Sequence, residues 1–267
     1  DHKIIEVVER NISIWEKLHN QNLLKQSQIY GKAYELWYID NNAEFRAIAL
    51  TPVNCYVLED ETVERKPLLA LHFFKPKFSE IEHMDCYTND RIIHFVLDGN
   101  KINYIGEDSH AFGRVPVSVC RANAEELSLI DNIKSLNDSY NQVLSDLVNE
   151  VADFRQCFMK ITGAELDEEE ANKMKRSGII HIPENGSIDY LVKEINDDFV
   201  QNLLEELEQK MFISVSTIDS NERMQSNNSG IAQRSRLFLL ESICGLIQSE
   251  LEVTIRRRIQ MFFYILG

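Results

Sequence analysis

Residues 125–155 read EELSLIDNIKSLNDSYNQVLSDLVNEVADFR, and this stretch decides the architecture predicted for the chain. It contains neither Pro nor Gly, and as a helix it would measure about 46 Å at 1.5 Å per residue. Asn123 and Glu126 form a capping-box pattern, so we expect the helix to begin beside them. Apolar residues recur at steps of three and four, which places them on one side of the helix: Leu127, Ile130, Ile133, Leu136, Tyr140, Val143, Leu144, Leu147, Val151 and Phe154. A rod with one apolar stripe needs a neighbouring surface to cover it.

Composition bounds the class of protein. The 267 residues suffice for one large domain or two modest ones with a packed core. The 43 acidic and 28 basic side chains give a net charge of −15. This charge argues against a free-standing protein that binds duplex DNA, because such a protein presents a net basic face. It is compatible with a surface past which nucleic acid slides, and equally with an ordinary self-repelling soluble surface.

The cysteines and the chain ends carry further expectations. Five cysteines are scattered along the chain without a CxxC pair, which favours free thiols in a reducing compartment. No run of about 18 apolar residues lacks a charge, so we expect no membrane span. The chain begins Asp1-His2 without a signal-peptide pattern and stops within an apolar helical run. We therefore expect an excised core of a longer protein.

The first half of the chain changes from helical to strand periodicity. Residues 3–26 are predicted to form a helix. Residues 29–105 are predicted to form one antiparallel meander of about six or seven strands, because short β-branched and aromatic runs alternate with turn signals. Residues 110–117 are expected to be an irregular extended segment that leads into the long helix. The predicted fold class is α+β, with a β-rich domain and long helices.

A small module follows the long helix. Residues 157–162 are a predicted short strand. Residues 178–182 and 188–192 are predicted to pair around the turn Asn185-Gly186, because Asn-Gly favours hairpins.

Two helices and a polar loop complete the chain. Residues 196–215 are a predicted helix capped by Asn196. Residues 217–230 are rich in Ser and Asn, which predicts a mobile polar loop. A long helix is expected at 231–266, and its segment 237–247 is apolar nearly all round, so we expect it to be buried on several sides.

The search for catalytic chemistry is negative. No phosphate-binding, dinucleotide-binding or nucleophile-elbow motif is present, so no catalytic residue, cofactor or metal is predicted. His83 and Cys86 have a spacing that suits a metal, but a structural zinc site needs four convergent ligands, and an alternating strand is the simpler interpretation. His110 is interpreted as a polar residue at a domain junction. The acidic run at 167–170 is interpreted as a solvated helix face.

Two groups of basic residues are candidates for contact with nucleic acid. Arg256, Arg257 and Arg258 fan over about 200° of a helix, so they cannot form one flat patch, and ion pairs with an acidic helix or subunit are the preferred interpretation. Lys173, Lys175 and Arg176 could contact a phosphate backbone or simply balance the acidic run before them.

Several motifs, in this order along the chain, are similar to those of one family. Residues 30–35 read YGKAYE, and residues 110–117 read HAFGRVPV and precede the long helix. That helix carries SLIDNIKSLNDSYN at 128–141, and residues 227–232 read NNSGIA and open the last helix. Together they resemble the portal proteins of tailed bacteriophages, in the siphovirus-type branch. The likeness covers most of the chain, roughly residues 28–260.

The resemblance implies a structural protein rather than an enzyme. Portal subunits form a ring of about twelve at one capsid vertex, around a tunnel through which double-stranded DNA is packaged and ejected. The implied partners are the terminase large subunit, a head-completion or adaptor protein that joins head to tail, and capsid and scaffolding proteins, with no membrane. The protein is then expected in the virion, after assembly in the host cytoplasm.

The resemblance also implies names for the parts: wing 1–121, stem helix 122–155, clip 156–195, second stem helix 196–215, tunnel loop 216–230 and a long helix returning to the wing at 231–267, without the family's C-terminal crown. In the tunnel loop, the uncharged residues expected to face DNA are Met224, Gln225, Asn227 and Asn228. Acidic residues near the loop would repel DNA and limit its sticking: Glu205, Glu206, Glu208, Asp219 and Glu222. The stripe of the first stem helix should be only partly covered within one chain, and the rest should face a neighbouring subunit.

Two alternatives stay open on the sequence alone. One is a helical scaffold or adaptor module, unrelated to phage, that binds protein partners. The other is an unrecognised hydrolase or metal enzyme, for which bound zinc at His83 and Cys86 would speak. A ring near twelve subunits would favour the portal, and a stable monomer or dimer of the full-length protein would favour the adaptor.

Overall fold

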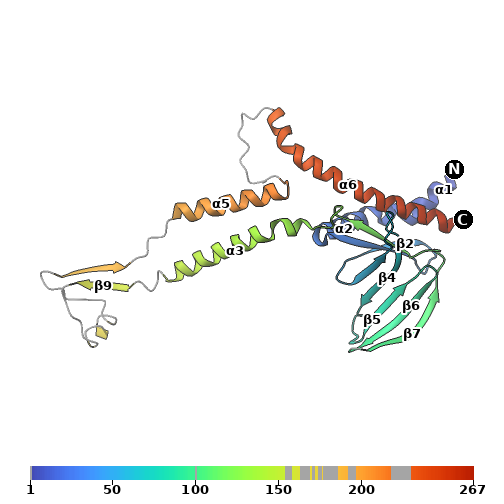
Figure 1. Ribbon diagram of the computed structural model, residues 1–267, viewed down its shortest axis with the longest axis horizontal. Coiled ribbons are helices and arrows are strands. Elements are labelled where there is room, and N and C mark those ends of the chain that lie inside the picture. Colours follow the sequence, from blue (N-terminus) through green and yellow to red (C-terminus); the bar gives the residue numbers. More distant parts are fainter. Residues whose placement is uncertain are drawn as a thin grey trace. The chain divides into compact units, whose positions relative to one another are not determined.

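The computed structural model describes residues 2–99, 101–153, 158–162, 169, 172–173, 176, 186–191, 197–217 and 230–267 (Figure 1). Its helices and antiparallel sheets confirm the α+β class. The chain divides into two compact units, one formed by residues 1–134 and 213–267 and the other by residues 135–212. Within the described part, no helix is both long and apolar enough to cross a membrane.

The N-terminal helical stretch extends beyond its predicted end at residue 26. Helix α1 (His2–Val8), the π-helical turn η1 (Glu9–Ser13) and α2 (Ile14–Tyr30) follow one another directly. Gly31 ends α2 in the left-handed conformation, with φ at 80°, which a residue without a Cβ adopts readily. The chain then turns into the first strand.

The strands predicted within 29–105 are present, but they do not form one meander. β1 (Lys32–Ile39) lies between β2 (Phe45–Leu50) and β8 (Val117–Arg121) in a three-stranded antiparallel sheet. Strand β8 was not predicted, because its stability comes from pairing with a strand far away in the sequence. Five strands form a second antiparallel sheet in sequence order: β3 (Cys55–Glu59), β4 (Pro67–Phe74), β5 (Glu82–Tyr87), β6 (Arg91–Asp98) and β7 (Lys101–Ser109).

The two sheets share one hydrophobic core. Side chains of β1, β2 and β8 pack with side chains from one face of the five-stranded sheet. The buried members are Tyr34, Leu36, Leu50, Cys55, Val57, Ala70, Tyr87, Val115, Val117 and Val119. We call the contributing face of the five-stranded sheet its inner face and the opposite face its outer face.

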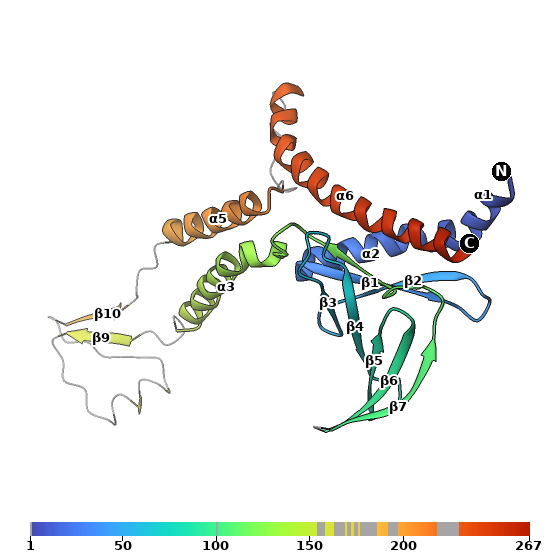
Figure 2. The same ribbon diagram turned by 45° about the vertical axis from the view of Figure 1, so that its right-hand side comes forward.

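Helix α6 (Gly230–Leu266) is a single helix of 37 residues. Its C-terminal half runs beside α2 and over β8 (Figures 1 and 2). There Met261 and Phe262 pack with Ile12, Trp37 and Phe45 in a second core cluster. These contacts fix α6 on the three-stranded sheet.

The burial predicted for segment 237–247 of α6 is wrong for a single chain. Phe238, Leu239 and Leu246 are 64%, 58% and 68% exposed. The core clusters that include α6 begin only at Leu251, so no other part of the described chain packs around this segment. The described fold of the single chain does not cover the apolar surface of this segment.

Helix α3 (Leu129–Asp153) begins later than the sequence pattern suggested. The backbone N–H of Asp131 donates to Ser128 Oγ at 3.0 Å, and the N–H of Ser128 donates to Asp131 Oδ2 at 3.1 Å. The expected cap, Asn123, instead accepts a hydrogen bond from the N–H of Leu127 at 2.9 Å. Glu126 has a positive φ of 57°, which is incompatible with a helix. Residues 123–127 therefore form a turn before the helix.

The helix predicted at 196–215 is present as α5 (Asp197–Ser214). Strands β9 (Phe158–Thr162) and β10 (Ser187–Leu191) form a two-stranded antiparallel sheet. The hairpin predicted around Asn185-Gly186 paired residues 188–192 with residues 178–182, but the structure pairs β10 with β9. Residues 178–182 and the cap Asn196 lie outside the described residues.

Candidate functional site

The predicted site residues fall largely outside the described part. Met224, Gln225, Asn227 and Asn228 all lie in the interval 218–229, which the structure does not describe, and so does Lys175. Lys173 and Arg176 are described and exposed. The described residues show two kinds of feature that bear on function. One is the polar contacts where α6 and α3 join the sheets, and the other is the exposed apolar side chains of these helices.

Arg258 joins α6 to the three-stranded sheet and to α2. Its side chain is 0% exposed. Its Nε donates to Glu35 Oε1 on β1 at 2.7 Å. Its two terminal nitrogens donate to Glu16 Oε1 at 3.2 Å and to Asn20 Oδ1 at 2.7 Å, both on α2. We call these residues, together with His19, the α6 anchor.

Glu35 forms its hydrogen bonds with other side chains of the protein and not with solvent. Its carboxylate is completely buried and accepts from Arg258, from Trp37 Nε1 at 3.0 Å and from His19 Nε2 at 2.7 Å. The guanidinium also stacks 5.4 Å from the ring of Trp15. A buried carboxylate persists only when it is paired and hydrogen-bonded in this way.

Part of the α6 anchor was visible in the sequence. Ion pairing of the arginine cluster with an acidic helix or subunit was predicted, and Arg258 does pair with Glu16 of α2. Helix α2 itself is not acidic, however, because it contains two lysines besides Glu16. Glu35 was missed, although a lone carboxylate in the apolar run AYELWY is the signal that could have found it. Arg256 pairs with Glu252 on its own helix.

A second charged group holds the start of α3. Glu126 pairs with Lys32 of β1 and with Arg121 of β8, whose Nε lies 2.9 Å from Glu126 Oε1, and Arg121 also pairs with Glu59 of β3. Partial burial alone would raise the pKa of Glu126, but the hydrogen bonds from Lys32 and Arg121 outweigh it and hold that pKa below its ordinary value. Both sheets are therefore tied to the turn that precedes α3.

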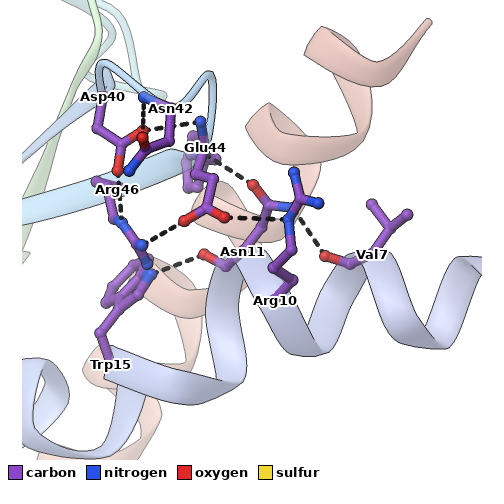
Figure 3. A network of polar contacts seen from close by, with 9 residues as sticks. Val7, Arg10, Asn11, Trp15, Asp40, Asn42, Glu44 and Arg46 are labelled. Carbon is purple, nitrogen blue, oxygen red and sulfur yellow. Dashed lines mark hydrogen bonds and ion pairs between the residues drawn. The ribbon is translucent and has the colours of Figure 1, made fainter.

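A third polar group pins the β1–β2 turn to the N-terminal helices (Figure 3). Asn11 in η1 accepts a hydrogen bond from the N–H of Phe45 at 2.8 Å and donates to the carbonyl of Val7 at 2.9 Å. Arg10 pairs with Glu44 at 3.0 Å. In the turn itself, the N–H of Glu44 is the main reason that the pKa of Asp40 lies below its ordinary value.

The long helices carry apolar residues that their own chain leaves uncovered. In the stretch 129–150 of α3, where side chains are described, none is buried. Ile130, Leu144 and Val148 are 47%, 36% and 67% exposed. The expectation of a partly covered stripe is confirmed for Ile130 and Leu144, and Val148 adds exposed apolar surface outside the predicted stripe.

The outer face of the five-stranded sheet is also apolar. Tyr56, Ile102 and Tyr104 on it are more than half exposed. The strand register places on it Tyr56, Leu58, Leu69, Leu71, Phe73, Met84, Cys86, Ile93, Phe95, Leu97, Ile102 and Tyr104. Contiguous apolar patches of this kind mark interaction surfaces.

The inner face carries a row of histidines and carboxylates beyond the core. His94 Nδ1 lies 2.7 Å from Asp85 Oδ1, and its Nε2 lies 3.2 Å from Asp108 Oδ2. Burial opposes protonation of His94, but the hydrogen bonds to the two carboxylates outweigh it and raise its pKa. Burial lowers the pKa of His72 in the same row.

Metal binding at His83 and Cys86 finds no geometric support. Both lie on β5, three positions apart, so their side chains point to opposite faces of the sheet. Across the described residues, no group of three His, Cys, Asp or Glu side chains is placed to hold a metal ion. His110 bonds to the carbonyl of Thr88 at 3.0 Å and accepts from the N–H of Phe112 at 3.3 Å, which suits the interpretation as a junction residue.

Comparison with known proteins gives consistent matches. A family model described as "Phage portal protein, SPP1 Gp6-like" matches residues 3–267. The portal protein of Bacillus phage SPP1 is 23% identical over 255 residues, which cover 87% of this chain and 50% of that relative. The portal protein of Clostridium phage phiCD119 is 24% identical over 176 residues, which cover 63% of this chain and 39% of that relative. The chain thus spans about half the length, or less, of these two relatives.

Proposed function

This chain belongs to the SPP1 Gp6-like family of phage portal proteins, and from that membership we propose that it is one subunit of a ring of about twelve at the capsid vertex. The family is structural and non-enzymatic, and its members are components of the phage capsid. Because the chain belongs to this family, the alternatives of a non-phage adaptor and of an unrecognised hydrolase or metal enzyme are set aside. The ring, its tunnel and its partners are the proposal.

The observation that carries the ring is the uncovered apolar surface of two long helices. Every subunit of a cyclic ring presents one surface to the neighbour on one side and a different surface to the neighbour on the other. Helix α3 offers one stripe, and segment 237–247 of α6 offers apolar residues on several sides. Exposed apolar surface of this kind marks interaction sites, and neighbouring copies in a ring would cover it.

The tunnel is the second part of the proposal. The parts named wing, stem, clip and tunnel loop follow the family order, with the DNA-facing positions at Met224, Gln225, Asn227 and Asn228. Glu205 and Glu206 are exposed on α5, and their charge would keep DNA from adhering. In the clip, Lys173, Lys175 and Arg176 are the candidate phosphate contacts.

The proposed partners follow from the same role. Double-stranded DNA passes through the tunnel during packaging and ejection. The terminase large subunit and the head-completion protein dock on the ring, which capsid and scaffolding proteins surround at the vertex. The site of action is the virion, after assembly in the host cytoplasm.

Ring formation is tested with paired substitutions on α3. Negative-stain electron microscopy and native mass spectrometry of the full-length protein should show rings of about twelve. Leu144→Asp places a charge on the apolar stripe and should abolish them, whereas Ser145→Asp on the adjacent exposed position should leave them intact. A full-length protein that stays monomeric at all concentrations, or rings unaffected by Leu144→Asp, would contradict the proposal.

Cys244 gives an independent readout on α6. It is an exposed free thiol within the apolar segment 237–247. A maleimide should label it rapidly in the single chain and at least about tenfold more slowly in the ring, because a neighbouring copy would exclude the reagent. Equal rates in both states would place this segment outside the interface.

The tunnel loop is tested by deletion. Removing residues 219–228 should leave ring assembly intact and block DNA packaging or retention in an assay with terminase and empty capsids. Normal packaging by this variant would overturn the tunnel assignment without affecting the ring.

A further inference from the structure

The C-terminal half of α6 carries apolar residues both on its contact face and at exposed positions. Thr254, Met261 and Phe262 are buried against the sheet and α2. Phe263, Tyr264 and Leu266 are 47%, 54% and 53% exposed. Burial of apolar area is non-directional, so it does not by itself select one position of this helix along its axis.

Arg258 distinguishes one position of this helix from the others. It is the buried charged side chain of α6, and its guanidinium needs acceptors at fixed positions. In the observed register it meets Glu35 of β1 and both Glu16 and Asn20 of α2. Acceptors from two different elements determine both the rotation of α6 and its position along its axis.

One-turn shifts of α6 show what the pairing excludes. A slide that brings Thr254 to the place of Arg258 moves Glu250 into the buried place of Thr254 and moves Arg258 among the aromatic residues around Phe262. The opposite slide places Phe262 over the carboxylate of Glu35 and leaves that carboxylate without its cation. Each shift buries an unpaired charge, which is strongly unfavourable.

We propose that Arg258, through its pairing with Glu35, sets the register of α6 on the three-stranded sheet, and that apolar packing alone does not. A single buried polar residue fixes helix register in coiled coils by the same physical principle. The inference concerns the isolated chain and therefore stands or falls independently of the ring and the tunnel.

A neighbouring pair of buried residues reports the register. Cys120 of β8 lies next to Thr254, and both are 0% exposed. In a chain whose other four cysteines are replaced by alanine, Thr254→Cys should form a disulfide with Cys120 in the native register. Glu250→Cys reports the shift by one turn that brings residue 250 to the place of Thr254. Peptide mass spectrometry after oxidative refolding gives the yield of each disulfide.

The decisive variant removes both charges. Arg258→Met alone leaves Glu35 without its cation and would destabilise the fold for that reason, so the test uses Glu35→Gln with Arg258→Met. In this double variant the yield of the 120–254 disulfide should fall at least about threefold, and that of the 120–250 disulfide should rise. Arg257→Met, the same substitution at the adjacent position, should leave the 120–254 yield unchanged.

Two results would overturn the proposal. One is a folded double variant that forms the 120–254 disulfide as efficiently as the Arg257→Met control. The other comes from Arg258→Lys, which keeps a buried positive charge beside Glu35 and should retain more of the native disulfide than the double variant does. A loss with lysine as large as that in the double variant would show that the charge is not what sets the register.

Discussion

Gly31 and Glu126 meet through their backbones, since a Cβ added to Gly31 would lie 1.9 Å from the carbonyl oxygen of Glu126. The carbonyl of Gly31 also accepts the N–H of Ala122 at 2.8 Å. The end of α2, the start of β1 and the turn before α3 therefore converge on one residue. No side chain fits at that position.

Gly31→Ala should lower the free energy of unfolding by more than about 3 kcal/mol, because positive-φ strain is added to a backbone clash. Chemical denaturation measures the change. Gly99→Ala is the matched control, since Gly99 also has positive φ but nothing lies within 4 Å of its added Cβ. The control should cost about 1–2 kcal/mol from strain alone. Equal costs would mean that the contact with Glu126 does not limit position 31.

His94 should make stability depend on pH. Its pKa in the folded protein is raised above the ordinary value of about 6.5, so its contribution is complete below that value and is lost as the pH rises through the folded pKa. The destabilisation caused by His94→Gln should therefore be larger at about pH 5 than at about pH 9. Denaturant unfolding at the two pH values gives the difference.

His72 provides the opposite sign. Burial lowers its folded pKa, so the folded state loses stability relative to the unfolded state as the pH falls through the unfolded value. His72→Gln should remove that acid sensitivity. Two histidines of the same row with equal pH profiles would contradict the hydrogen-bond assignment of His94.

Asn11→Ala should cost about 1–3 kcal/mol, because it leaves the buried N–H of Phe45 without an acceptor. Thermal and chemical unfolding measure this cost. Asn22→Ala is the control on the exposed side of α2, where the side chain makes only a 3.4 Å contact with Gln26. The control should stay within about 0.5 kcal/mol of the parent.

Ser128→Ala should weaken the start of α3 by about 1 kcal/mol through loss of the cap to Asp131. Hydrogen exchange of the first turn of α3 should accelerate accordingly. Ser145→Ala, at an exposed mid-helix position, should change exchange little or slow it slightly, because alanine favours helix. If Ser128→Ala leaves the protection from hydrogen exchange unchanged, Asn123 and not Ser128 would be the N-cap of α3.

Local patterns predicted the helices well. The period of three and four residues located α3 and α5, and α6 was also predicted, because each helix satisfies its backbone hydrogen bonds within its own segment. The start of α3 was misplaced because Asn123–Glu126 and Ser128–Asp131 are two capping patterns five residues apart, and only the contacts of Glu126 with Lys32 and Arg121 select between them.

Nonlocal pairing was not predictable from the sequence alone. The division of the strands into two sheets depends on β8 joining β1, for which the sequence of Val117–Arg121 carries no local signal. The pairing of β9 with β10 is nonlocal in the same way. The partnership of Arg258 with Glu35 was missed for this reason, although Glu35 was anomalous in its apolar surroundings. The family resemblance, in contrast, was confirmed, because it depends on motif order and not on contacts.

The single-helix construction of α6 turns the anchor at Arg258 into the pivot of a lever. Gly230 lies 28 residues before Arg258, a distance of about 42 Å along the axis. A rotation of about 5° at the pivot would displace the first residue of the helix by about 4 Å, more than the length of a hydrogen bond. Small angular errors at the anchor are thus magnified at the far end, so the position of that end depends on how tightly Arg258 and the packing of Met261 and Phe262 hold the C-terminal half.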